Sequence, residues 1–111
     1  MIVRKLLMTL LLVLPISMSW AADQHLADRH GARGTQCVSC HGNEKPSANV
    51  SNDRCLACHG SYAQLAEKTA KLDVNPHASH LGDMPCVRCH QGHKPSVLIC
   101  NNCHQFKMAV P

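Results

Sequence analysis

Hydrophobic residues form one continuous run near the N-terminus and are scattered along the rest of the chain. The run "LLMTLLLVLP" follows Arg4 and Lys5 and is succeeded by the smaller residues of "ISMSWAADQ". A basic start, a short apolar stretch and small residues in this order are typical of a secretory signal peptide. We expect cleavage after Ala21, so that residues 1–21 form the signal peptide and residues 22–111 form a single mature domain. An uncleaved N-terminal anchor is the alternative, although the run is short for a bilayer span.

Beyond the leader, one segment has the periodicity of an amphipathic helix. The segment "SYAQLAEKTAKL" begins at Ser61, which forms the sequence pattern of a capping box with Gln64. A stripe at helical spacing follows, made of Tyr62, Leu65, Ala66, Thr69 and Leu72. We therefore predict a helix over residues 61–72 whose stripe is an ordinary packing face and not a surface for a partner protein.

The remaining segments have no strand-like alternation of polar and apolar residues. The stretches "NEKPSANVSND" (43–53) and "QGHKPS" (91–96) are polar and rich in turn formers, so they predict loops. Asn75 suits a helix N-cap and Pro76 suits the first helical position, which together predict a short helical turn. The predicted fold class is mainly irregular, with a few short α-helices and little or no β-sheet.

The composition shows that the chain has few large aromatic side chains with which to fill a hydrophobic core. Aromatic residues make up 3% of the sequence, and Tyr62 and Phe106 are the ones that follow the leader. A domain of this size is near the limit at which apolar burial alone outweighs chain entropy. We therefore expect a cofactor to fill the interior. The formal net charge is +4, but the basic residues are scattered, which argues against a nucleic-acid partner.

All eight cysteines lie in one motif, C-x-x-C-H, which occurs as "CVSCH", "CLACH", "CVRCH" and "CNNCH". This motif is the attachment sequence of c-type haem, in which the thiols form thioethers and the following histidine ligates the iron. A thioredoxin-like pair or half a zinc site does not require that histidine four times. The one-to-one match also argues against a disulfide framework. The motifs therefore predict four covalently bound haems in a compact multihaem cytochrome c fold, with the polypeptide wrapped around them.

The motifs assign the first set of haem-binding residues. The cysteines expected to hold haem are Cys37, Cys40, Cys55, Cys58, Cys86, Cys89, Cys100 and Cys103. The iron ligands expected from the motifs are His41, His59, His90 and His104.

The second iron ligands must come from elsewhere, and the chain has a suitable supply. Of nine histidines, four lie in the motifs, which leaves His25, His30, His77, His80 and His93. Four irons each need one further ligand, and five histidines are available to provide it. These numbers favour bis-histidine ligation, in which the iron mainly passes electrons. Histidine–methionine ligation through Met84 or Met108 is the alternative.

Spacing limits how these histidines are shared. His93 follows His90 by three residues and can hardly reach the opposite face of the same haem, so we expect it to serve a different haem. Each of His77 and His80 is likewise assigned to a different haem, because one iron has only one remaining position. His30 is favoured over His25, which lies close to the expected mature terminus.

Taken in order, these segments resemble a known family. The series "RHGARGTQCVSCH … CLACHGSYAQLAEKTAK … NPHASH … CVRCHQGHKP … CNNCHQF" resembles the small tetrahaem cytochromes c of respiratory bacteria. It is still more similar to the tetrahaem domain of periplasmic flavocytochrome c fumarate reductases, over nearly the whole expected mature chain. The resemblance implies bis-histidine ligation throughout, with His25 as the spare residue. By position it implies the distal ligands His30, His77, His80 and His93.

One departure from that family bears on activity. In the flavocytochromes the tetrahaem domain continues into a large flavin domain, whereas this sequence ends at "QFKMAVP" and has no residues for flavin or substrate chemistry. We therefore expect an electron carrier that reduces no organic acid by itself. It would act as a soluble shuttle or as the cytochrome subunit of a separate flavin-containing reductase.

The expected setting is the periplasm and anaerobic respiration. The donor would be a quinol-oxidising membrane cytochrome, the acceptor a flavin reductase subunit or another terminal reductase, and no stable membrane insertion would follow signal cleavage. The rival hypothesis is a small multihaem reductase of an oxyanion, which would need one five-coordinate haem.

Overall fold

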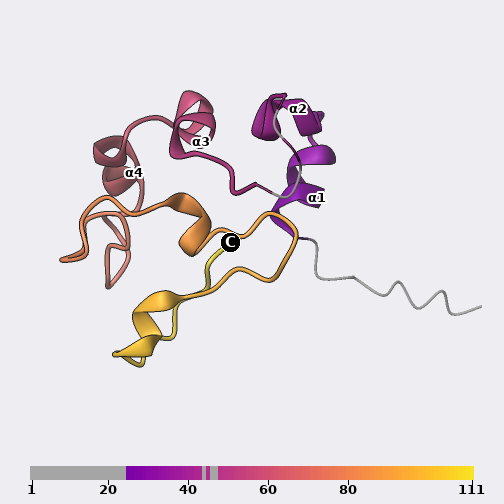
Figure 1. Ribbon diagram of the computed structural model, residues 1–111. Coiled ribbons are helices and arrows are strands. Elements are labelled where there is room, and N and C mark those ends of the chain that lie inside the picture. The colour runs from indigo at the N-terminus through magenta and orange to yellow at the C-terminus, as the bar shows by residue number, and fades with distance from the viewer. Residues whose placement is uncertain (1–24, 44, 46–47) are drawn as a thin grey trace, which may run out of the picture.

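The fold consists of short helices joined by long irregular segments (Figure 1). The computed structural model describes residues 25–43, 45 and 48–111, so the predicted signal peptide lies outside the described residues. The elements in chain order are α1 (Leu26–Gly31), α2 (Cys37–His41), α3 (Asn52–His59), α4 (Tyr62–Lys68) and the 3-10 helices η1 (Cys86–Arg88) and η2 (Ile99–Asn102). The described residues include no strand. The predicted fold class is confirmed.

The polypeptide has no side-chain core of its own. Within the described ranges no residue, apolar or polar, is fully buried. Four large hydrophobic side chains are even strongly exposed, namely Val38, Leu72, Leu81 and Val97. This agrees with the composition, which is too poor in large apolar side chains to fill an interior.

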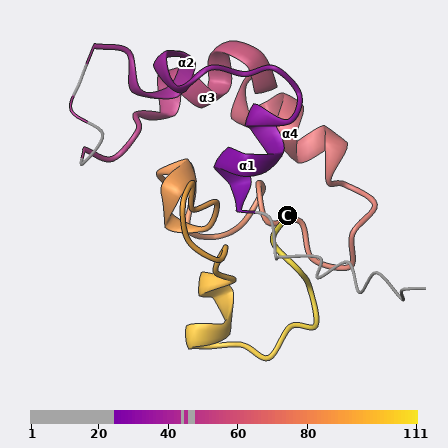
Figure 2. The ribbon, with the colours of Figure 1, turned by 90° about the vertical axis from the view of Figure 1, so that its right-hand side faces the viewer.

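A few contacts link the helices across the sequence. Helix α3 packs against α2 and also against η1, so the second cysteine motif lies beside the first and the third. Helix α1 is held to the C-terminal half by a hydrogen bond from the Ala27 amide to the Gly92 carbonyl, at 2.8 Å. Figure 2, turned by 90°, shows α1 between the α2–α4 side of the chain and the segment that carries η1 and η2.

Helix α4 begins as predicted but ends earlier. Ser61 accepts a hydrogen bond from the Gln64 amide, and the Gln64 side chain accepts one from the Ser61 amide at 2.9 Å, so the capping box is confirmed. The helix ends at Lys68, whereas the prediction extended to Leu72. The physical reason is that the Asn75 side-chain amide donates to the Ala66 carbonyl at 2.8 Å. In a continued helix that carbonyl would accept from Ala70.

The other helices were missed or misplaced by the sequence pattern. Helices α1, α2 and α3 have five to eight residues each, which is too short for periodicity to be read. The predicted loop 43–53 is wrong at its end, because α3 begins at Asn52. Asn75 does cap the following turn, accepting from the His77 amide at 3.1 Å, but residues 76–80 form turns and bends and no helix. The predicted loop 91–96 is confirmed.

Glycines end the two motif helices with backbone conformations that other residues rarely adopt. Gly42 follows α2 with φ 58°, and Gly60 follows α3 with φ 87°. A Cβ atom at Gly60 would lie 2.3 Å from Gln64 Oε1, the atom that completes the capping box of α4. Gly60 therefore allows α3 and α4 to follow one another without a spacer.

Replacing Gly60 by alanine should lower the free energy of unfolding of the haem-loaded protein by about 1–2 kcal/mol, because positive φ is strained for alanine and the Gln64 cap is displaced. The measurement is a chemical denaturation midpoint. Gly31→Ala is the matched control, since its φ is not positive and a Cβ there meets nothing within 4 Å. We expect it to change stability by less than about 0.5 kcal/mol. Equal losses in the two variants would contradict the prediction.

Candidate haem centres

Each cysteine motif forms one helical turn that presents two thiols and a histidine together. The first two motifs lie on α2 and at the end of α3, and the last two lie on η1 and η2 with the residues that follow them. In the third motif the His90 amide bonds to the Cys86 carbonyl at 2.8 Å, and in the fourth the His104 amide bonds to the Cys100 carbonyl at 2.9 Å. All eight thiols are free of disulfides. Every motif therefore has both sulfur atoms available for a thioether.

Thiols of successive motifs lie near enough to influence one another. Burial raises the pKa of Cys55 to about 11, with further contributions from Cys86 of the third motif and Cys40 of the first. Burial also raises the pKa of Cys89, and Cys100 of the fourth motif adds to the effect. The four attachment points therefore follow one another in space as they do in the sequence.

The histidines form four pairs, and each pair joins one motif histidine to one of the other histidines. The ring centroids are 6.0 Å apart for His41 and His93, 5.9 Å for His59 and His30, 6.2 Å for His90 and His77, and 6.2 Å for His104 and His80. An imidazole nitrogen binds a metal at about 2 Å, so two imidazoles on opposite sides of one iron have centroids roughly 6 Å apart. The spacing of all four pairs suits an iron between the rings.

The pairs differ in how the two rings are oriented. The planes are nearly parallel in the first and third motifs, at 10° for His41 with His93 and 5° for His90 with His77. They are strongly inclined in the second and fourth motifs, at 61° and 60°. The four centres therefore comprise two geometries that alternate along the chain.

His25 has a different place. It precedes α1 as the N-cap residue, and its amide donates to the Asp28 carboxylate at 3.0 Å. No ring contact joins it to any motif histidine among the described residues, whereas His30 faces His59 from the same helix. Of these two histidines, His30 is therefore the one whose ring lies beside a motif histidine.

Hydrogen bonds fix the ring nitrogens that face away from the pairs. His30 Nδ1 bonds to the Leu26 carbonyl at 2.9 Å, and His77 Nδ1 contacts Thr69 Oγ1 at 3.2 Å. Burial, followed by the nearby His90, lowers the pKa of His77. A neutral imidazole held at one nitrogen leaves the other nitrogen free to bind a metal.

One polar cluster that links two of the motifs was missed at the sequence level. Asn52 Oδ1 accepts from the Cys86 amide at 2.9 Å, and Asn52 Nδ2 donates to the Tyr62 hydroxyl at 3.0 Å. That hydroxyl donates to the Met84 carbonyl. Asn52 therefore joins the helix of the second motif to the start of the third. Asn52 lies in the polar stretch 43–53, which the sequence predicts as a loop, so no sequence signal identified its role.

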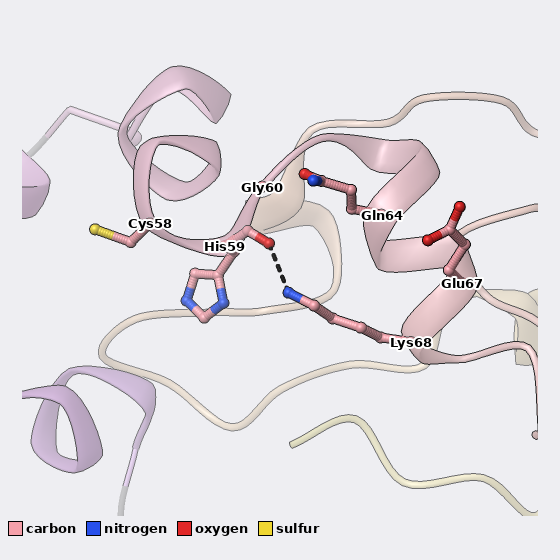
Figure 3. Close-up of a pocket in the computed structure, with 6 residues that line it drawn as sticks. All are labelled: Cys58, His59, Gly60, Gln64, Glu67 and Lys68. Atoms are coloured by element: carbon pink, nitrogen blue, oxygen red, sulfur yellow. Dashed lines mark hydrogen bonds between the residues drawn. The ribbon is translucent and has the colours of Figure 1, made fainter.

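A pocket of about 540 Å³ opens beside the second motif (Figure 3). Cys58 and His59 line it from the end of α3, together with Gly60. From α4, Gln64, Glu67 and Lys68 complete the lining, and Lys68 Nζ donates to the His59 carbonyl at 3.0 Å. The lining therefore includes one attachment cysteine and the histidine of the same motif. The free thiols, the paired histidines and this space fit covalently attached haem.

The chain matches the family model described as cytochrome c3 over residues 29–105. The match covers all four motifs and the histidines paired with them. The chain belongs to the cytochrome c3 family. As such it is a multihaem electron-transfer protein with covalently bound haem c, and the resemblance inferred from the motifs is confirmed.

Relatives of this cytochrome c3 chain include much longer proteins. It is 41% identical over 101 residues to the probable fumarate reductase Ifc3 of Shewanella frigidimarina, covering 86% of this chain and 16% of that protein. It is 38% identical over 40 residues to the cytochrome c-type protein Cgr1 of Eggerthella lenta, covering 36% of this chain and 18% of that one. The sequence therefore spans less than a fifth of the length of these relatives.

A solved structure has the same fold. The open conformation of a flavocytochrome c3 fumarate reductase superposes with a TM-score of 0.63 and 38% identity, covering 78% of this cytochrome c3 chain and 16% of the other. In the described part of the chain no helix has the length and hydrophobicity needed to cross a bilayer.

Proposed function

We propose that this cytochrome carries electrons through four covalently attached haems, each bound by two histidines. The observation that supports the proposal is the set of four histidine pairs at 5.9–6.2 Å, each made of one motif residue and one other. The proposed iron ligands are the motif histidines His41, His59, His90 and His104, with His93, His30, His77 and His80 as their respective partners.

The chain contributes attachment, orientation and spacing. The eight cysteines would hold the macrocycles, and the histidine on each side would fill both axial positions. When bound, the haem supplies a one-electron ferric–ferrous couple at each centre. Contacts of α3 with α2 and η1, and the neighbouring thiols of successive motifs, bring the attachment points together in chain order. Short distances between neighbouring haems would favour electron transfer from each haem to the next.

The proposed setting is the periplasm, with residues 22–111 as the mature domain. The choice of redox partner is guided by the names of similar proteins, which include a probable fumarate reductase and a flavocytochrome c3 fumarate reductase. We propose that electrons arrive from a quinol-oxidising membrane cytochrome. They would leave to a flavin-containing reductase subunit or another terminal reductase, which this chain serves as a shuttle or as a subunit.

Direct reduction of an oxyanion is the less favoured function. It requires an iron with one open axial face at which substrate can bind. Here each of the four motif histidines has a second histidine at a distance suited to filling that face. We therefore propose that the chain itself is a carrier and no enzyme.

Haem analysis of the exported protein tests the proposal. The pyridine haemochrome assay should give four haems per chain, and the intact mass should show four covalent additions to a polypeptide that begins at Ala22. The oxidised and reduced optical spectra should be uniformly low spin and unchanged by carbon monoxide. A haem count below four, or a fraction of the wild-type haem that binds carbon monoxide, would contradict the proposed ligation.

A further inference from the structure

A polar cluster outside the four centres contacts one of the proposed ligands. Thr69, at the C-terminal end of α4, places Oγ1 2.6 Å from Asn75 Oδ1 and 3.2 Å from His77 Nδ1. All three residues are partly buried. Because Thr69 has a single hydroxyl proton, the direction of each hydrogen bond in the cluster can be worked out.

The orientation of the Asn75 amide is fixed by two independent contacts. Its nitrogen faces the Ala66 carbonyl at 2.8 Å, which accepts and cannot donate. Its oxygen accepts from the His77 amide at 3.1 Å, which donates and cannot accept. In a flipped amide, the Asn75 nitrogen would face the His77 amide, and both groups are donors. The Asn75 oxygen would face the Ala66 carbonyl, and both groups are acceptors. Asn75 Oδ1 is therefore an acceptor toward Thr69.

This assignment decides the direction of the hydrogen bond between Thr69 and His77. The short contact between Thr69 Oγ1 and Asn75 Oδ1 needs a proton between the two oxygens, and the Thr69 hydroxyl provides it. The Leu65 carbonyl, 2.9 Å from the same Oγ1, is also only an acceptor. Thr69 then has a lone pair and no proton to offer His77. The His77 ring must therefore donate from Nδ1–H, which leaves Nε2 unprotonated.

We propose that Thr69 is a positioning residue for His77, fixing its Nδ1–H tautomer and directing Nε2 toward the iron of the third motif. The inference rests on the proposed ligation of that iron by His77 and His90. His30 and His90 use main-chain oxygens, those of Leu26 and Pro111, for the equivalent contact. At His77 the contact is made by a side chain, so substitution can remove it at one haem alone.

The hydrogen bond has a defined electronic effect. A ligating imidazole that donates its other N–H becomes more basic, and losing such a partner typically changes metal affinity about 10- to 100-fold. A more basic ligand favours ferric over ferrous iron. Without the Thr69 hydroxyl, the equilibrium constant that favours ferric over ferrous iron at this haem should fall about tenfold. This change raises the reduction potential of the haem by about 59 mV for a one-electron couple.

The experiment compares Thr69→Val, which keeps the shape and removes the hydroxyl, with Thr69→Ser, which restores it. Spectroelectrochemical titration of the four-haem protein should show one potential raised in Thr69→Val and returned toward wild type in Thr69→Ser. Electron paramagnetic resonance should show one altered low-spin ferric signal in the valine variant. Thr35→Val is the matched control, because Thr35 is exposed and its hydroxyl makes no hydrogen bond in the described structure. This variant should change neither the potentials nor the paramagnetic resonance signals.

Failure of this inference can be separated from failure of the proposed function. If wild type has four low-spin bis-histidine haems but Thr69→Val leaves all potentials and signals unchanged, the positioning role is wrong and the ligation stands. If wild type lacks four such haems, the ligation itself is wrong. Should Thr69→Val not mature, nitrogen-15 NMR of reduced wild type decides: a slowly exchanging proton on His77 Nδ1 supports the role, and rapid exchange overturns it.

Discussion

Replacing His30 by alanine should create one haem that binds carbon monoxide, in a protein that otherwise binds none. His30 lies 5.9 Å from His59 by ring centroid, and its Nδ1 is held by the Leu26 carbonyl at 2.9 Å. On the proposed ligation, loss of this imidazole would leave one of the four irons with an open coordination position. A carbon monoxide difference spectrum of the reduced variant should therefore titrate to one equivalent per chain, with a matching high-spin fraction in the oxidised spectrum.

His25→Ala provides the matched control from the same end of the chain. His25 caps α1 and has no motif histidine as a ring partner among the described residues. The variant should keep four low-spin haems and bind no carbon monoxide. Carbon monoxide binding in His25→Ala but not in His30→Ala would exchange the roles of the two histidines. Binding in neither variant would show that the second axial position of this haem is filled by another residue.

A chain made without haem attachment should be unfolded under conditions in which the haem-loaded protein is folded. No side chain in the described part of the chain is fully buried, so the polypeptide alone gains little from hydrophobic burial. Its α-helices have five to eight residues, far below the length at which isolated helices are stable. Cytoplasmic expression of the mature segment without the maturation machinery, under reducing conditions, supplies the test sample.

Circular dichroism and amide hydrogen exchange provide the comparison. The haem-free chain should give a far-ultraviolet spectrum without appreciable helix and should exchange its amides at nearly unprotected rates. The exported, haem-loaded protein is the control and should retain protected amides in α3 and α4. Persistent protection of α4 in the haem-free chain would show that side-chain packing stabilises the fold more than the exposure of its residues indicates.

The haem sites could be predicted from the sequence because covalent attachment needs a contiguous motif. The C-x-x-C-H units identify the cysteines and the first ligand directly, and the number of remaining histidines indicates the second. Which histidine faces which motif could not be predicted, since His93 meets His41 across 52 positions of sequence while His77 meets His90 across 13. The complete ligand set stays a prediction until it is tested, although the four pairs include every member of it.

The secondary structure was less predictable, for a related reason. Apolar periodicity reports packing against a protein interior, and in this chain no described side chain is buried in one. Helix α4 was recognised by its capping residues, Ser61 and Gln64, together with its stripe at helical spacing, and its end was missed because the Asn75 side chain, well beyond the helix, donates to the Ala66 carbonyl. Local signals therefore identified where this helix begins, whereas a residue more distant in the sequence decides where it ends.

The alternating ring angles imply that the proposed iron centres are not electronically equivalent. On the proposed ligation, the two parallel imidazoles of the first and third pairs would overlap with the same iron d orbital, and this orbital would then differ in energy from the second d orbital of the same type. The inclined rings of the second and fourth pairs would each interact with a different one of these two orbitals, so that the orbitals would lie closer in energy. On the proposed ligation, an electron that moves along the chain meets two kinds of ferric ground state in turn, although all four irons have the same ligand atoms.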